Sequence, residues 1–159
     1  MLLFDGVSHS QEARDRQIAD ISPQLDPELY VFSSVIPEMA YGSEWRNIIL
    51  RFLGAIALAR LESGDYAVVL PQDKALEWDW DGEFPCRLIT LDVDPHTPNR
   101  AFVAALMALF ENLGITVRFF RAYPNLWLFV EDGRGADAMQ LLRSMAADAT
   151  RHLELLLPT

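Results

Sequence analysis

The sequence predicts an α+β fold made of two similar units that follow one another in one chain. Over residues 86–94 apolar and polar residues alternate, as in a half-buried strand, and over 97–114 apolar residues recur at helical spacing. Two further apolar runs flank Pro124, and a second amphipathic helix is expected over 134–149. The second half therefore reads β-α-β-β-α-β, an order that covers one face of a sheet with two helices.

The helix expected over 97–114 directly follows its strand. Thr97 can cap this helix, Pro98 suits its first turn, and Gly114 suits its C-terminal exit. Its predicted apolar stripe consists of Phe102, Leu106, Leu109 and Leu113. The inward face of the second helix is predicted to hold Ala138, Leu141, Leu142 and Met145. Residues 152–158 then form either a closing strand or an extension of that helix.

The first half has a weaker β-α-β-β order that follows a polar, acidic segment. Residues 62–65 have the composition of a hairpin turn, and Gly82 with Pro85 marks the best candidate boundary. The expected elements are a helix over 10–21, a strand over 29–35, a turn over 37–42, a helix over 43–53, a hairpin over 55–71 and a helical turn over 72–78. The expected domains are an N-terminal segment over 1–22, a degenerate first unit over 23–82 and a second unit over 83–159.

The composition is that of a globular protein with an acidic surface. The 159 residues are 51% hydrophobic, and 13 Lys and Arg against 23 Asp and Glu give a formal net charge of -10. Such a charge repels nucleic acid and anionic membranes, so neither is expected as a partner. The single cysteine, Cys86, excludes an internal disulfide and is expected to be a small buried residue. No signal peptide or membrane span is expected, and the expected location is the cytoplasm.

Five stretches of the sequence carry a family resemblance. In chain order they are ISPQLDPELYVFSSV, ALARLESGDYAVVLP, FPCRLITLDV, LFENLGITV and LFVE, which extend over about residues 20–147. Together they resemble the small stand-alone ACT domain-containing proteins of bacteria, which are made of two ACT-like units. The resemblance implies a ferredoxin-like β-α-β-β-α-β fold with two such units packed in tandem. It further implies a regulatory role in which an amino acid is bound, and side-by-side pairing of units as a homodimer or within one chain.

The loop between the first strand and the first helix is where such domains usually hold their ligand, and here it comprises residues 94–100. The family often has a small glycine-bearing segment there, whereas this chain has Pro95, Pro98 and Arg100. A backbone without glycine approaches a ligand less closely. This departure favours an alternative role, that of a structural or partner-binding module that has lost its ligand.

Three potential metal ligands occur at this loop. Asp92, Asp94 and His96 are spaced two residues apart, as they would be if one strand pointed all three at one ion. Pro95 and Pro98 break the strand geometry that this spacing requires, so no metal site is expected. His96 is then an exposed loop residue or part of a site for an organic ligand.

Two interpretations of the same loop stay open. In one, Asp92 is solvated or meets a partner unit, and Asp94 or Thr97 satisfies free amides at the start of the helix. In the other, Asp94 or Asp92 binds the amino group of a ligand, whose carboxylate lies on the helix amides near Asn99 and Arg100. The second interpretation places opposite charges at the two ends of a zwitterion.

Arg118 and Arg121 lie three apart on an expected strand and therefore face opposite ways. They are either surface or interface charges, or one of them holds a carboxylate. The candidate ligand-binding residues are Asp92, Asp94, His96, Thr97, Asn99, Arg100 and Arg118.

The sequence contains no pattern that indicates catalysis. It has no nucleophile elbow, phosphate loop or paired-histidine motif, and its three histidines lie in polar or terminal segments. We therefore expect no enzyme, no catalytic residue and no cofactor. The first functional hypothesis is a non-catalytic sensor that binds a small molecule such as an amino acid. The second is the partner-binding module described above.

Overall fold

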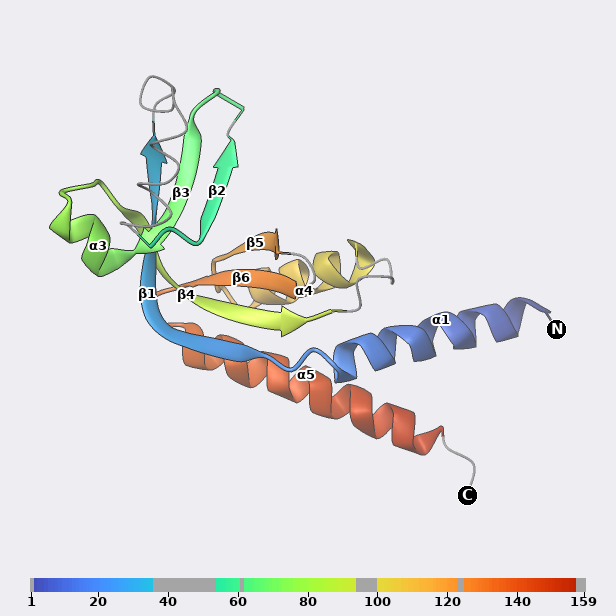
Figure 1. The fold of residues 1–159 in the computed structure, drawn as a ribbon. Coiled ribbons are helices and arrows are strands. Elements are labelled where there is room, and N and C mark those ends of the chain that lie inside the picture. The colour runs from blue at the N-terminus through green and yellow to red at the C-terminus, as the bar shows by residue number, and fades with distance from the viewer. Residues whose placement is uncertain (1, 36–53, 61, 94–99, 123–124, 157–159) are drawn as a thin grey trace. The chain divides into compact units, whose positions relative to one another are not determined.

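The computed structural model describes residues 2–35, 54–60, 62–93, 100–122 and 125–156 (Figure 1). Its elements are α1 (Leu2–Ala19), β1 (Gln24–Val35), β2 (Ala57–Arg60), β3 (Tyr66–Pro71), α3 (Gln72–Glu77), β4 (Glu83–Asp92), α4 (Arg100–Asn112), β5 (Val117–Ala122), β6 (Asn125–Glu131) and α5 (Gly135–Leu155). None of the helices in these ranges is long and apolar enough to cross a membrane. The predicted turn over 37–42 and helix over 43–53 lie outside the described residues.

The chain folds into two compact units. The continuous unit consists of Pro27–Leu88, and the split unit combines Met1–Asp26 with Ile89–Thr159. Strands β1 and β4 therefore contribute residues to both units. This division differs from the contiguous one expected from the sequence, which separates the units between residues 82 and 83. The reason is that β4 is one unbroken strand that starts at this boundary and is divided between the units.

Hydrogen bonds join the strands in the order β2-β3-β1-β4-β6-β5. In the continuous unit the first strand is β1, with β3 of the β2-β3 hairpin on one side and β4 on the other. In the split unit the first strand is β4, with β6 of the β5-β6 hairpin on one side and β1 on the other. Each unit thus has the strand order of a ferredoxin-like sheet, which confirms the predicted α+β fold class.

The fourth strand of the split unit comes from the start of β1 and not from the C-terminal segment. Helix α5 continues to Leu155, so the helical interpretation of that segment is confirmed and the strand interpretation is wrong. The backbone N–H of Asp92, at the end of β4, donates to the carbonyl of Ile21, 2.7 Å away, just before β1. A strand from the other end of the chain thus lies beside β4.

The core of the split unit lies between its sheet and the helices α4 and α5. Helix α4 buries Phe102, Leu106 and Phe110 in this core. The predicted stripe is thus correct at Phe102 and Leu106 and wrong at its end, since Leu113 is 52% exposed. Helix α4 ends at Asn112, and the chain then turns through Gly114 at a φ of 68°. A residue beyond the last helical turn does not continue the helical stripe.

Helix α5 packs its apolar face on the same core, as the sequence predicts. Ala138 and Leu142 are buried there, and Leu141 and Met145 are half-buried against it. Helix α1 packs along α5, so the N-terminal segment is part of the split unit. At this contact the buried Asp15 accepts a hydrogen bond from Gln11 Nε2, at 3.2 Å.

The continuous unit has a smaller core. Val31, Val68, Leu70 and Ala75 are buried in it, and Trp80 packs against it from the segment before β4. Nearby in the chain, Cys86 is fully buried, as predicted, and its Sγ donates to the Tyr30 carbonyl at 3.4 Å.

Candidate ligand site

The split unit has a cavity of about 400 Å³ between α4 and the β5-β6 hairpin, which lie against each other in Figure 1. The described residues that line it are Arg100, Val103, Ala104, Met107, Phe119, Arg121 and Leu126. This volume falls in the range of small-molecule sites, which is roughly 300–1,000 Å³.

Local geometry explains why these side chains meet. The four lining residues of α4 are separated by three, one and three positions, so they lie on one face of the helix. On β5, Phe119 and Arg121 are two apart and share one face of the strand. Leu126 stands directly opposite Arg121 on β6, in the register of the hairpin. One helix face and one sheet face thus form the two walls of the cavity.

The described lining of the cavity includes two cationic side chains, Arg100 and Arg121. Arg100 lies at the start of α4 and Arg121 near the end of β5, and both side chains are exposed. A guanidinium group stays protonated at any physiological pH and forms paired hydrogen bonds with carboxylates. No acidic side chain occurs among the described residues that line the cavity.

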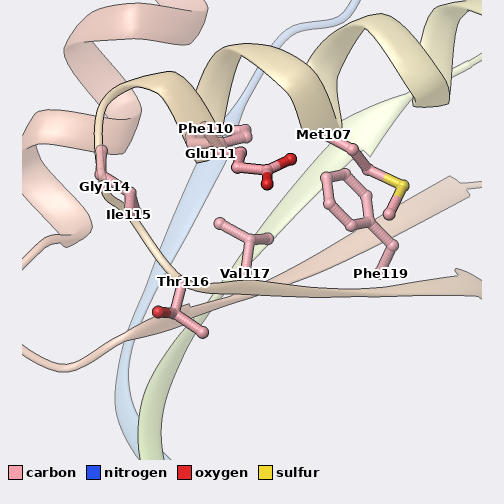
Figure 2. Close-up of a pocket in the computed structure, with 8 residues that line it drawn as sticks. All are labelled: Met107, Phe110, Glu111, Gly114, Ile115, Thr116, Val117 and Phe119. Atoms are coloured by element: carbon pink, nitrogen blue, oxygen red, sulfur yellow. The ribbon is translucent and has the colours of Figure 1, made fainter.

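A second cavity, of about 380 Å³, adjoins the first along α4 and β5 (Figure 2). It shares Met107 and Phe119 with the first. Its described lining residues are Met107, Phe110, Glu111, Gly114, Ile115, Thr116, Val117 and Phe119. In Figure 2 Phe119 and Val117 point from β5 toward α4, and Met107 points back toward Phe119. We call these two neighbouring cavities together the α4–β5 groove.

The continuous unit has a cavity of different chemistry. It has a volume of about 460 Å³ and includes three acidic residues, Asp79, Asp81 and Glu83. Its other described lining residues are Phe32, Ser33, Ser34, Trp80 and Gly82. These acidic side chains disfavour an anionic ligand. The part of the chain that the structure describes shows no cluster of three or more His, Cys, Asp or Glu residues suited to a metal ion.

The structure describes three of the seven ligand-binding residues that the sequence predicts, and it places them at different positions. Asp94, His96, Thr97 and Asn99 lie outside the described residues. Arg100 lines the groove. The positions of the other two, Asp92 and Arg118, follow from the face of the sheet on which each side chain lies.

Asp92 and Arg118 lie on the sheet face opposite α4. Leu91 belongs to the core beneath the helices and Phe119 packs against it, so their neighbours in the strands point the other way. The structure therefore separates Arg100 from Asp92 and Arg118. The expectation that Arg118 and Arg121 face opposite ways is consistent with Arg121 lining the groove. Arg121 is not among the ligand-binding residues that the sequence predicts, although its alternation with Phe119 along β5 is a signal in the sequence.

No family model matches the chain, and no curated protein matches it. Solved structures do resemble it. A protein of unknown function from Vibrio cholerae, described as a possible transport protein, has 25% identity and a TM-score of 0.69, over 85% of this chain and 97% of the other. A protein from Agrobacterium tumefaciens has 12% identity and a TM-score of 0.60, over 79% and 89% of the two chains.

The ligand-free regulatory subunit of aspartate kinase from Thermus thermophilus has 10% identity and a TM-score of 0.58. The match covers 79% of this chain and 97% of that subunit. At this identity the likeness is one of fold. It agrees with the ferredoxin-like fold that the sequence predicts.

Proposed function

We propose that the protein is a non-catalytic regulatory protein of the cytoplasm that binds a small carboxylate-bearing metabolite in the α4–β5 groove and acts as a homodimer. Amino acids belong to this class of ligand, together with other small organic acids. The observation that carries the proposal is the cavity in which Arg100 and Arg121 lie on two facing walls. The fold it shares with a regulatory subunit supports the same role.

Charge complementarity supports a carboxylate as the group that is recognised. The chain has a formal net charge of -10, so two guanidinium groups at one cavity stand out against an acidic background. The same lining includes the apolar side chains Val103, Met107 and Phe119, which can cover one side of a bound ligand. A charge-assisted hydrogen bond is stronger in such surroundings than in bulk water.

A thermal-shift screen of the full chain against amino acids, their 2-oxo acids and simple carboxylates tests the proposal. A ligand at a hundred times its dissociation constant adds about 2.7 kcal/mol to the free energy of unfolding, which raises the melting temperature visibly. Arg100→Ala and Arg121→Ala are expected to abolish the shift. Arg118→Ala removes the same group from the opposite face of β5 and should retain it.

The unliganded melting temperature supplies the control for folding. Exposed substitutions usually change stability by at most about 0.5 kcal/mol, so Arg100→Ala should lower the unliganded melting temperature by no more than about 2 °C. A large loss would show that Arg100 is structural. No response to any carboxylate would contradict the proposed ligand site.

A partner-binding role is the second candidate, and one observation favours it. Met107 is 51% and Leu113 is 52% exposed on α4 and just beyond it, next to β5 at the edge of the sheet. An exposed edge strand beside apolar side chains can pair with a strand of another protein. Under this role, Arg121→Ala would leave partner binding intact and Met107→Gln would weaken it, as measured by sedimentation with the purified partner.

A further inference from the structure

We propose that helix α1 is a reversible arm, which docks on α5 and can leave it while β1 keeps its place in the sheet. This inference goes beyond the proposed function and does not depend on a ligand in the α4–β5 groove. It follows from the side chains that hold α1 against α5 and from the point at which the chain is anchored after α1.

Few apolar side chains hold α1 in place. Helices α1 and α5 pack along each other in the split unit (Figure 1). Among the described side chains of α1, Ile18 is the one that packs against the core of this unit, and it is half-buried. By comparison, α5 buries Ala138, Met139 and Leu142 in the same core. Elements with few buried apolar contacts open locally at a lower free energy than the elements of the core.

The contact between α1 and α5 buries a carboxylate. Asp15 of α1 is 6% exposed, and its Oδ1 accepts a hydrogen bond from Gln11 Nε2 of the same helix at 3.2 Å. Its Oδ2 lies 3.7 Å from Nδ1 of His152 on α5. The His152 side chain is 69% exposed, so water competes with this interaction between the helices. Docking of α1 therefore takes a carboxylate out of water and gives it a solvated partner on α5.

The chain is anchored directly after α1. The helix ends at Ala19, and Ile21 is fully buried in the core of the split unit. The carbonyl of Ile21 accepts a hydrogen bond from the backbone N–H of Asp92 at 2.7 Å, which holds Ile21 beside the end of β4. The backbone N–H groups of Asp20 and Ile21 donate to carbonyls of α1 at 3.2 and 3.5 Å, which are longer bonds. Helix α1 can therefore swing about Asp20 while Ile21 and β1 stay in place.

The docked arm covers part of α5. Ala149 of α5 is 4% exposed. It lies one turn before His152, which approaches Asp15 of α1, so Ala149 is on the face of α5 that meets α1. Release of the arm therefore makes the surface of α5 around Ala149 accessible.

Thiol labelling of the full chain measures this opening. Ala149→Cys places a thiol under the arm, and the native Cys86, fully buried in β4, reports unfolding of the sheet in the same molecule. Each labelling rate is divided by the rate of the same thiol in the urea-unfolded protein. The introduced thiol should then react at least about a hundredfold faster than Cys86. Equal relative rates would overturn the inference, because the surface around Ala149 would then open only together with the sheet.

A matched pair of variants tests what holds the arm. Combined with Ala149→Cys, Ile18→Ala should raise the labelling rate of the introduced thiol at least about fivefold and leave that of Cys86 unchanged, since Ile18 supplies the apolar contact of α1. Leu76→Ala, at a residue of the continuous unit that is 74% exposed, should change neither rate. If Ile18→Ala accelerates the labelling of both thiols alike, α1 opens only with the whole fold and the inference fails.

Hydrogen exchange of the unsubstituted protein repeats the test without an introduced thiol. The backbone amides of residues 15–19 should exchange at least about a hundredfold faster than those of β4. The amide of Asp92, which donates to Ile21, should be as well protected as the rest of β4. Equal protection of α1 and β4 would overturn the inference, and so would loss of protection at Asp92 together with α1.

Discussion

Gly82 occupies a position in the continuous unit where a side chain has no room. It lies just before β4, and a Cβ atom built at this position would be 2.8 Å from Cγ2 and 2.9 Å from Cβ of Val31. Val31 is buried in the core of that unit, so it has little freedom to move away. Because Gly82 has no Cβ atom, the backbone at this position can lie close to Val31 of β1.

A double-mutant cycle measures this contact. Gly82→Ala should lower the free energy of unfolding by about 1–3 kcal/mol, the usual cost of overpacking. The same substitution in a Val31→Ala background should cost less, because the crowded methyl groups are gone. Urea denaturation of the four proteins gives the coupling energy, and an equal cost in both backgrounds would contradict the proposed clash.

The functional site also depends on single residues. Arg118 and Arg121 are of the same type on the same strand, yet only Arg121 lines the groove. The alternation of side chains along β5 decides this difference, and the sequence already predicts it. Which of the two faces α4 follows only from the position of Phe119 against the core.

Helices α4 and α5 are held by burial of one face each. Leu142 is fully buried in the core of the split unit, whereas Leu155 at the end of the same helix is 82% exposed. The two leucines therefore contribute very differently to stability, although both lie in one helix of 21 residues.

Leucine-to-alanine substitutions on α5 test the position of this core. Leu142→Ala should lower the free energy of unfolding by about 2–5 kcal/mol through lost burial and the cavity left behind. Leu155→Ala should change it by less than about 0.5 kcal/mol, as exposed substitutions usually do. Chemical denaturation monitored by circular dichroism compares the two, and similar values would argue against the described packing of α5.

The two units share strands β1 and β4. Each strand contributes residues to both units, so unfolding of one unit removes the hydrogen-bonding partner of a strand that continues into the other. Small single domains usually unfold in one cooperative step, and the shared strands lead us to expect the same of these two units.

Tryptophan fluorescence can test this cooperativity. Trp127 lies in the split unit, whereas Trp78 and Trp80 lie in the continuous unit. The fourth tryptophan, Trp45, lies outside the described residues. Trp127→Phe therefore leaves probes of the continuous unit, and the triple replacement of the others by Phe leaves a probe of the split unit. Within each variant, the urea midpoints from fluorescence and from circular dichroism should coincide. Two separate midpoints would show that the units unfold independently.

Much of this protein could be predicted from its sequence, because local periodicity and turn residues report local structure. The β5-β6 hairpin, the helix α4 and its exit at Gly114, and the ferredoxin-like fold class are examples. Pairing between distant segments has no such local signal. The sequence allowed residues 152–158 to form the closing strand beside β4. In the structure the start of β1 lies there, and α5 remains helical to Leu155.

The candidate site, like the fold, could be predicted from the sequence only in part. The sequence itself identified Arg100 as a candidate and predicted opposite directions for Arg118 and Arg121. Only the tertiary structure decided that Arg121 lies with Arg100, and that Asp92 and Arg118 lie on the other face of the sheet. The physical reason is that a ligand site needs side chains from elements that are distant in sequence. Their distance in space is set by the packing of α4 on the sheet, which no local pattern encodes.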